Sequence, residues 1–242
     1  MQLASNIIKG SLLRRYKRFL ADVELENGEV IIAHCANTGK MTGCAEPGVI
    51  VWLSQNNNPA RKLKYSWELT ETEAGHIIGI HSAKANDIVD EALLTKQIDL
   101  LARYDNIQRE VKVGSNSRID FVVSNNVEQC FVEVKSVTLL GENGIGMFPD
   151  TVSERASRHV QELMILKQQG HRAVLFFCVQ HSGINGVCPA DEIDPAYGDI
   201  VRQAMAMGVE VLAYGCELSV AEIKLTKPLS WFASLSDAQQ AR

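Results

Sequence analysis

The chain has 242 residues, of which 46% are hydrophobic, 22% charged and 6% aromatic, with 17 glycines and 6 prolines. This is the composition of an ordinary globular protein, and it excludes a disordered chain, a collagen-like repeat and a disulfide-rich miniprotein. The formal net charge is -5, so the chain as a whole gives no electrostatic argument for a polyanionic partner. Because domains contain roughly 100 to 200 residues, we expect two of them.

The cysteines and the apolar segments indicate a cellular compartment. The 6 cysteines include no CxxC pair, and their spacing fits no zinc module, so we expect reduced thiols. Residues 1–10 lack the apolar core of a secretory signal. The longest apolar run, residues 173–179, is too short to span a bilayer, which needs about 20 residues. We therefore expect a soluble, cytoplasmic protein without membrane association.

The first third of the chain has the pattern of a small β-domain. Residues 19–26 alternate apolar and polar side chains, and Asn27-Gly28 then gives a strong signal for a two-residue hairpin. We predict strands at residues 19–26, 29–34, 49–54, 64–70 and 77–82. Five strands without a helix favour a five-stranded OB-like β-barrel, to which we assign residues 1–84.

The pattern changes at Asn86, a good helix N-cap that is followed by apolar residues at helical spacing. We predict helices at residues 86–96, 153–169 and 195–207, and strands at residues 108–113, 118–123, 130–137, 172–179 and 209–214. Helices that alternate with strands favour a three-layer α/β/α domain with a mixed sheet, which we assign to residues 85–242. The predicted fold class of the second domain is therefore α/β. The whole chain, with its separate β-barrel, is predicted to be an α+β two-domain protein.

The strongest chemical signal lies in the predicted hairpin of residues 118–137. Alternate residues of a strand share a face, so Glu133 and Lys135 project together. We expect Asp120, on the neighbouring strand, to lie within reach of Glu133. Two carboxylates this close repel each other unless a cation or a proton lies between them. Their hard oxygen ligands favour Mg²⁺ or Mn²⁺.

These three residues also have the chemistry that metal-assisted phosphodiester hydrolysis needs. A divalent cation polarises the phosphoryl oxygen and lowers the pKa of a bound water, while a nearby ammonium stabilises the developing negative charge. We therefore predict Asp120, Glu133 and Lys135 as catalytic residues. The alternative interpretation is a solvated strand that carries a surface ion pair.

Five short segments follow one another in a characteristic order and spacing. They are residues 16–20 (YKRFL), 34–41 (HCANTGKM), 117–121 (SRIDF), 133–139 (EVKSVTL) and 148–150 (FPD). Together they resemble the sugar fermentation stimulation protein family. The resemblance implies an N-terminal OB-like domain joined to a domain of the PD-(D/E)XK nuclease superfamily. It also implies DNA binding without strong sequence preference and a regulatory role in maltose metabolism.

The resemblance assigns roles to individual residues. It implies that Asp120 is the motif aspartate, Glu133 the second acid and Lys135 the motif lysine. Nucleases of this superfamily usually carry a further glutamate on the preceding helix, for which we choose Glu91. Glu110, on the strand just before Asp120, is the alternative. The implied metal ligands are thus Asp120, Glu133 and Glu91.

Basic and aromatic residues near the N-terminus predict a surface that binds nucleic acid. Residues 1–20 carry five basic side chains and no acidic one. OB-folds hold single strands in a basic groove, with aromatic side chains that stack on the bases. Two further candidates for phosphate contacts lie on the predicted helix of residues 153–169, beside the proposed metal site. The predicted nucleic-acid-binding residues are Arg14, Arg15, Tyr16, Lys17, Arg18, Arg155 and His159.

Our leading hypothesis is a protein that binds DNA mainly through the phosphate backbone and has a Mg²⁺-dependent phosphodiesterase site in its second domain. RNA is an alternative partner. The role in maltose metabolism comes from the resemblance alone. Two other functions stay open, namely an active metal-dependent DNA or RNA nuclease and a regulator that responds to a small molecule.

Overall fold

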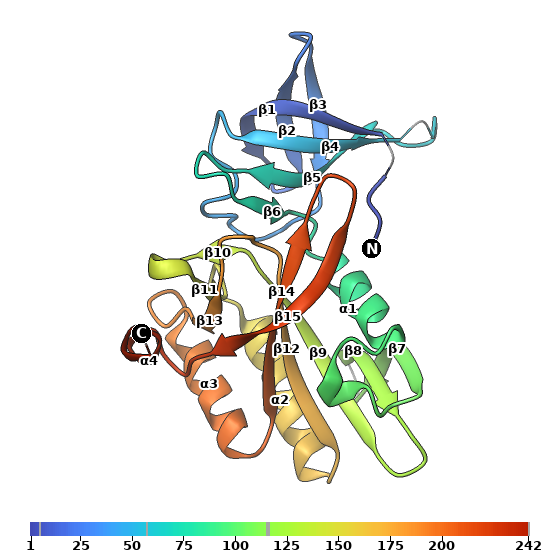
Figure 1. Cartoon of the computed structure of the whole chain (residues 1–242), viewed down its shortest axis with the longest axis vertical. Helices are drawn as coiled ribbons and strands as arrows, with labels where there is room; N and C mark the ends of the chain where they lie inside the picture. Colours follow the sequence, from blue (N-terminus) through green and yellow to red (C-terminus); the bar gives the residue numbers. More distant parts are fainter. Residues whose placement is uncertain (5, 57, 115–116, 242) are drawn as a thin grey trace.

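The structure is a computed structural model that describes residues 1–4, 6–56, 58–114 and 117–241, in two parts stacked along its longest axis (Figure 1). The first part, drawn in blue to teal, is a β-barrel, and the second part holds a larger sheet and the helices. Among the described helices, none is both long and apolar enough to cross a membrane.

The barrel is a closed ring of five strands. They are β1 (Ile7–Tyr16), β2 (Leu20–Leu25), β3 (Val30–Cys35), β4 (Ile50–Gln55) and β5 (Tyr65–Glu71). Neighbours pair in the order β1-β2-β3-β5-β4, and β4 pairs with β1 to close the ring. A short strand, β6 (Ile77–Gly79), adds to β5 outside the ring. Leu12, Val23 and Trp67 are among the side chains that fill the interior. The predicted OB-like barrel is confirmed.

One of the five predicted barrel strands forms, as the shorter β6, but does not belong to the ring. The sequence pattern predicts a strand at residues 77–82 as the fifth member, but the ring uses β1 instead. Within β1, the pairing with β2 shifts register between Leu12 and Arg14. A bulge of this kind interrupts the alternation of apolar and polar residues. The period-two signal that identifies a strand is therefore lost in this segment.

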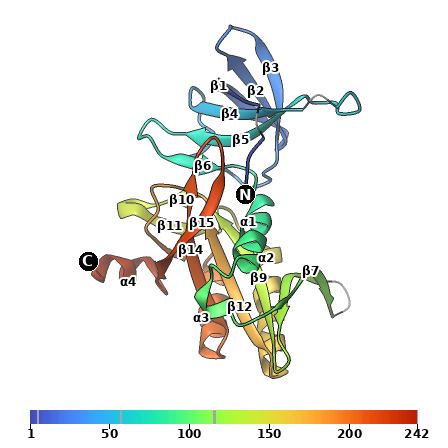
Figure 2. The same ribbon diagram turned by 45° about the vertical axis from the view of Figure 1, so that its right-hand side comes forward.

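The second part is built on a nine-stranded mixed sheet with helices on both faces (Figure 2). The strand order is β10-β11-β13-β15-β14-β12-β9-β8-β7. The strands are β7 (Asn106–Val113), β8 (Ser117–Ser124), β9 (Gln129–Val137), β10 (Leu139–Leu140), β11 (Ile145–Phe148), β12 (Arg172–Val179), β13 (Gly186–Pro189), β14 (Glu210–Leu218) and β15 (Ile223–Trp231). The helices are α1 (Lys84–Leu94), α2 (Glu154–Gln168), α3 (Pro195–Ala206) and α4 (Leu235–Gln240), with short 3-10 helices η1 (Asp99–Leu101) and η2 (Glu142–Gly144).

Two separate hydrophobic cores give the second part its three layers. On one face, α1 packs Ile88 into a cluster that includes Val132 of β9. On the other face, α2 and α3 pack Val160 and Val201 into a cluster that includes Leu175 of β12. The predicted α/β/α domain with a mixed sheet is confirmed. The short strands β10, β11 and β13 and the strand β15 have no counterpart among the predicted strands.

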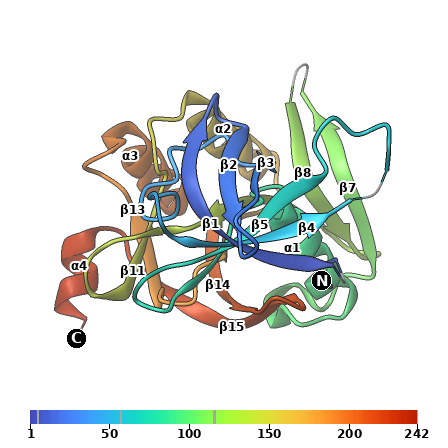
Figure 3. The ribbon, with the colours of Figure 1, turned by 90° about the horizontal axis from the view of Figure 1, so that it is seen from above.

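The barrel sits over the middle of the larger sheet. Seen from above, β7 emerges on one side of the barrel and α4 on the other (Figure 3). Backbone hydrogen bonds join the two parts: the Gly79 N–H donates to the Gln180 carbonyl at 2.8 Å, and the Ser182 N–H donates to the Ile77 carbonyl at 3.0 Å. This junction holds the barrel loops against the centre of the sheet.

Candidate active site

The candidate site lies where strands β8 and β9 separate. Their pairing begins at Ser124 and Gln129 and ends at Phe121 and Val132, while β9 continues beside β12 to Val137. The Asp120 side chain takes the place of the missing strand partner, because its Oδ2 accepts a hydrogen bond from the Val134 N–H at 2.7 Å. This fork in the sheet places the Asp120 carboxylate next to Glu133.

Glu133 is almost fully buried, with 2% of its surface exposed. Its Oε1 accepts a hydrogen bond from Lys135 Nζ at 2.6 Å and also contacts Nδ1 of His159. Its Oε2 is buried and has no hydrogen-bond partner among the described residues. The two oxygens of one carboxylate therefore have different environments, and Oε2 is the one left for a ligand.

The pKa values of the two carboxyl groups are shifted in opposite directions. Burial and the nearby Glu133 carboxylate raise the pKa of Asp120 to about 6. Burial alone would raise the pKa of Glu133 too, but the hydrogen bond from His159 and the charge of Lys135 outweigh it and lower that pKa. The mutual repulsion is the effect that a bound cation would relieve.

Asn86 supports the site instead of capping its helix. The sequence predicts Asn86 as an N-cap, but α1 begins at Lys84, and its N-cap residue Ala83 offers no side-chain hydrogen bond. Nδ2 of Asn86 donates to Oδ1 of Asp120 at 2.8 Å. With the Val134 N–H on its other oxygen, the Asp120 carboxylate is held by donors from two layers of the fold.

A cleft of about 830 Å³ surrounds these residues, and both parts of the molecule line it. Asn37, Thr38 and Gly39 of the β3–β4 loop form the barrel's share of the wall. Asp150 holds this loop in place, because its Oδ2 accepts a hydrogen bond from the Met41 N–H at 3.1 Å. Gly39 packs so closely that an added Cβ would lie 2.5 Å from the same oxygen. The position of the barrel thus determines the shape of the cleft.

Basic side chains line the cleft beside the carboxylates. Arg118, Arg155 and Arg158 contribute to its walls, as the sequence predicts for Arg155. His159, also predicted as a phosphate contact, lines the cleft too, and it is 7% exposed and contacts Glu133. Guanidinium groups form strong, charge-assisted hydrogen bonds with phosphate oxygens. The cleft therefore combines guanidinium groups, whose chemistry suits phosphate, with carboxylates, whose chemistry suits a cation.

The carboxylates fit a divalent cation that also keeps water and substrate as ligands. Throughout the described ranges, no three or more His, Cys, Asp and Glu side chains gather into a metal site. Enzymes often hold Mg²⁺ with only one or two carboxylates, together with water and substrate phosphates. Asp120 and the free Oε2 of Glu133 supply that smaller set of ligands.

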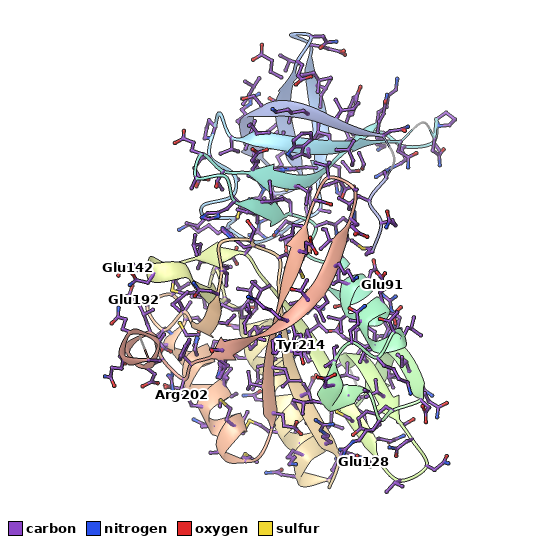
Figure 4. The ribbon with its side chains drawn as sticks, in the orientation of Figure 1. Glu91, Glu128, Glu142, Glu192, Arg202 and Tyr214 are labelled. Atoms are coloured by element: carbon purple, nitrogen blue, oxygen red, sulfur yellow. The ribbon has the colours of Figure 1, made fainter. Side chains whose placement is uncertain are left out.

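The predicted third acid is not at the site. Glu91 projects from α1 near the start of the chain, where it forms an ion pair with the Met1 amino group (Figure 4). The alternative, Glu110, lines the cleft. The apolar stripe of α1 packs on the sheet through Ile88 and Val89, so Glu91 does not lie on the face toward the sheet. The helical pattern of the sequence gives no sign of its ion pair with Met1. The Glu91 prediction was wrong in its geometry.

Some residues of the barrel's basic cluster form hydrogen bonds or ion pairs within the barrel, and others are exposed. Arg14 pairs with Asp22 at 2.7 Å, and the Tyr16 hydroxyl donates to the same carboxylate at 3.0 Å. Arg15 donates to the Arg18 carbonyl at 2.9 Å and to the Asn37 carbonyl at 2.7 Å. Since Asn37 lines the cleft, Arg15 connects the β1–β2 turn to the cleft wall.

The β1–β2 turn displays the exposed members of this cluster. Lys17 and Arg18 both have φ in the left-handed region, at 48° and 63°, a backbone conformation that favours Gly or Asn. Both side chains are exposed. Phe19, which follows them, is 47% exposed. The sequence pattern predicts Phe19 as the first residue of a strand, whereas the structure places it in the turn.

Family models match most of the chain. Residues 13–80 match the model described as the SfsA N-terminal OB domain, and residues 83–222 match the model described as the sugar fermentation stimulation protein RE domain.

Curated relatives and a solved structure show the same similarity. A sugar fermentation stimulation protein homolog of Pseudoalteromonas atlantica is 53% identical over 231 residues, which cover 95% of this chain and 98% of that protein. A homolog of Psychromonas ingrahamii is also 53% identical, over 89% of this chain and 96% of that protein. The structure of Pyrococcus furiosus SfsA in complex with Ca²⁺ superposes with a TM-score of 0.86 at 28% identity, covering 96% of this chain and 98% of that one.

Proposed function

Because the chain belongs to the sugar fermentation stimulation protein family, we propose that it is a metal-dependent phosphodiesterase that acts on DNA held by its barrel. The observation that carries this proposal is the arrangement of Asp120, Glu133 and Lys135 in one cleft. The Ca²⁺ bound by the Pyrococcus relative supports a divalent cation at these oxygen ligands. We expect Mg²⁺ or Mn²⁺ to support turnover, since both prefer such ligands.

Each residue of the cleft has a role in this proposal. Asp120 and Glu133 would hold the cation, which, when bound, would polarise the phosphoryl oxygen and lower the pKa of a bound water. Lys135 lies beside Glu133, where its ammonium stabilises the negative charge that develops as water attacks phosphorus and the ester bond breaks. Arg118 and Arg155 bind neighbouring phosphates.

The barrel supplies affinity in the same proposal. Lys17 and Arg18 present two exposed charges on a turn whose backbone conformation is unfavourable for both residues, and such strain gathers at functional sites. Phe19 offers an exposed ring for an unpaired base. Arg15 fixes this turn to Asn37 at the edge of the cleft. A DNA strand bound at the turn would thus lie beside the cleft that holds the carboxylates of Asp120 and Glu133.

A second candidate function is a DNA-binding regulator of sugar metabolism that does not cleave. Two observations favour it: the relatives are named for sugar fermentation, and in the described residues no group of three or more His, Cys, Asp and Glu side chains forms a metal site. Both candidates share the DNA-binding barrel. They differ in whether the cleft catalyses the cleavage of DNA.

The test combines binding and cleavage in one assay. Labelled single- and double-stranded DNA are incubated with the protein in Mg²⁺, Mn²⁺, Ca²⁺ or EDTA, beside the variants Asp120→Asn and Glu192→Gln. Glu192 is an exposed acid that does not line the cleft (Figure 4), so its variant controls for the loss of one negative charge. Metal-dependent cleavage that only Asp120→Asn loses supports the phosphodiesterase. Binding in EDTA without cleavage in any metal supports the regulator instead.

A further inference from the structure

His159 is a buried imidazole whose contacts define its proton. It lies on α2 with 7% of its surface exposed. Nε of Arg155, one helical turn earlier, lies 3.5 Å from Nε2 of His159. Lys135 Nζ lies 3.3 Å from Nδ1 of the same ring, but Nδ1 also contacts Oε1 of Glu133. A carboxylate oxygen only accepts, so this contact places a proton on Nδ1. Nδ1–H then donates to Oε1 of Glu133.

Two donors therefore meet on one oxygen of Glu133. Lys135 Nζ also donates to Oε1, at 2.6 Å, whereas the buried Oε2 has no partner among the described residues. Lys135 alone, on a flexible side chain, does not choose between the two oxygens. The imidazole is rigid and is fixed on a packed helix that buries Val160 beside it. Groups that hydrogen-bond to a metal-ligating carboxylate determine its orientation.

We propose that His159 is a positioning residue that holds the Glu133 carboxylate with Oε2 turned toward a divalent cation. This inference rests on the proposed function, since it takes Glu133 as a metal ligand. His159 acts through Glu133, and Arg155, at the wall of the cleft, is the group that meets phosphate. This inference gives His159 a role in cation binding, whereas the sequence predicts a phosphate contact for it.

Ca²⁺ binding tests the inference without any turnover. The wild-type protein is compared with His159→Asn, His159→Gln and His159→Ala by calorimetry and by the rise of Tm with added Ca²⁺. The amide nitrogen of Asn reaches the position of Nδ1, whereas that of Gln reaches the position of Nε2. We expect the Ala and Gln variants to weaken Ca²⁺ affinity about 10- to 100-fold, and the Asn variant to recover most of the loss.

A matched control is available beyond the C-terminal end of the helix. His171 is a half-buried imidazole that packs edge-on against Phe131, with ring centroids 4.9 Å apart. His171→Asn makes the same chemical change away from Glu133, and we expect it to leave Ca²⁺ affinity unchanged. If His159→Ala does not fold, the Asn and Gln variants still decide the matter, because they differ only in where the amide lies.

The tautomer gives a second readout that needs no metal. Two-bond nitrogen–proton correlation spectra identify the protonated nitrogen of each histidine ring, and we expect it to be Nδ1 in His159. A proton on Nε2 overturns the inference, because Nδ1 would then have nothing to donate to Glu133. Wild-type Ca²⁺ affinity in both the Ala and Gln variants overturns it too, while leaving the metal site in place. Absence of Ca²⁺ binding in the wild type overturns it together with the proposed metal site, so the two failures are distinguishable.

Discussion

The β1–β2 turn and the cleft present charge in opposite ways. At the turn, Lys17 and Arg18 stand in solvent, where their attraction for a polyanion extends over about 10 Å at 0.1 M salt. In the cleft, the side chains of Glu133 and Lys135 are only 2% and 11% exposed, so each charge depends on its partner. Under the proposed function, the turn supplies the affinity for DNA and the cleft supplies the cleavage, so each property should change without the other.

The largest expected effect separates the cleft from the turn. Glu133→Gln removes the charge that binds the cation, and we expect cleavage of DNA to fall by about 10³-fold or more, which corresponds to about 4 kcal/mol of transition-state stabilisation. DNA affinity measured in EDTA should stay at the wild-type value. Single-turnover assays and binding titrations check both. A matching loss of DNA affinity would contradict the assignment of binding to the turn and cleavage to the cleft.

The next effect tests base stacking at the turn. Phe19→Ala removes an exposed ring, and we expect the binding of single-stranded DNA to weaken by about 1–2 kcal/mol. Duplex binding should change little, because paired bases offer no free face. Fluorescence anisotropy with both forms of one sequence measures the difference. Val127→Ala, at another exposed apolar residue, is the control, and an equal loss there would count against stacking.

Neutralising the charges of the turn should have a slightly smaller effect. For Lys17→Gln combined with Arg18→Gln we expect roughly tenfold weaker binding at 0.1 M salt. The slope of log affinity against log salt concentration should fall by about 1.4 to 1.8, as two phosphate contacts are lost. Lys224→Gln with Lys227→Gln removes two exposed charges from β15 and should leave the slope unchanged. An unchanged slope in the turn variant would remove the turn from the interface.

The smallest effect concerns His181, at the junction between the barrel and the larger sheet. Burial and the neighbouring His76 lower the pKa of His181 to about 4, below the ordinary value of about 6.5. The stability that the neutral ring contributes is present above pH 6.5 and is lost as the pH falls toward 4. Between pH 7 and 5 we expect a loss on the order of 1 kcal/mol from this group.

Urea denaturation at the two pH values measures this loss. Nδ1 of His181 accepts a hydrogen bond from the Gly183 N–H at 3.0 Å, and the amide oxygen of Asn can accept it in place of the ring. His181→Asn should therefore make the stability less dependent on pH, whereas His171→Asn should not. A pH dependence that His181→Asn leaves intact would assign the effect to other groups.

The sequence predicts those features that follow from local pattern. The hairpin signal between residues 118 and 137 is local, so the sequence could place Asp120 near Glu133, with Lys135 on the same face as Glu133. The helix at α2 is predicted because Ser153 caps it, accepting a hydrogen bond from the Ala156 N–H at 3.2 Å. In both cases, neighbouring residues contain the physical reason for the structure.

The features that were missed depend on contacts between distant segments. The choice between Glu91 and Glu110 depends on how α1 packs on the sheet and on the Met1 amino group. Asn86 is equally suitable as a helix cap and as a partner of Asp120, and only the packed structure decides. The bulge in β1 hides a strand that its pairing partners define. No window along the chain contains this information.

The fork between β8 and β9 has a consequence for insertions and deletions. Since the side-chain period of a strand is two, removing one residue from β9 between Gln129 and Glu133 would turn the carboxylate and the ammonium to the α1 face and bring Val132 and Val134 into the cleft. The turn at residues 125–128 lies at the opposite end of the hairpin, where an added residue leaves this alternation untouched. The chemistry of the site thus tolerates changes in length at one end of the hairpin and forbids them at the other.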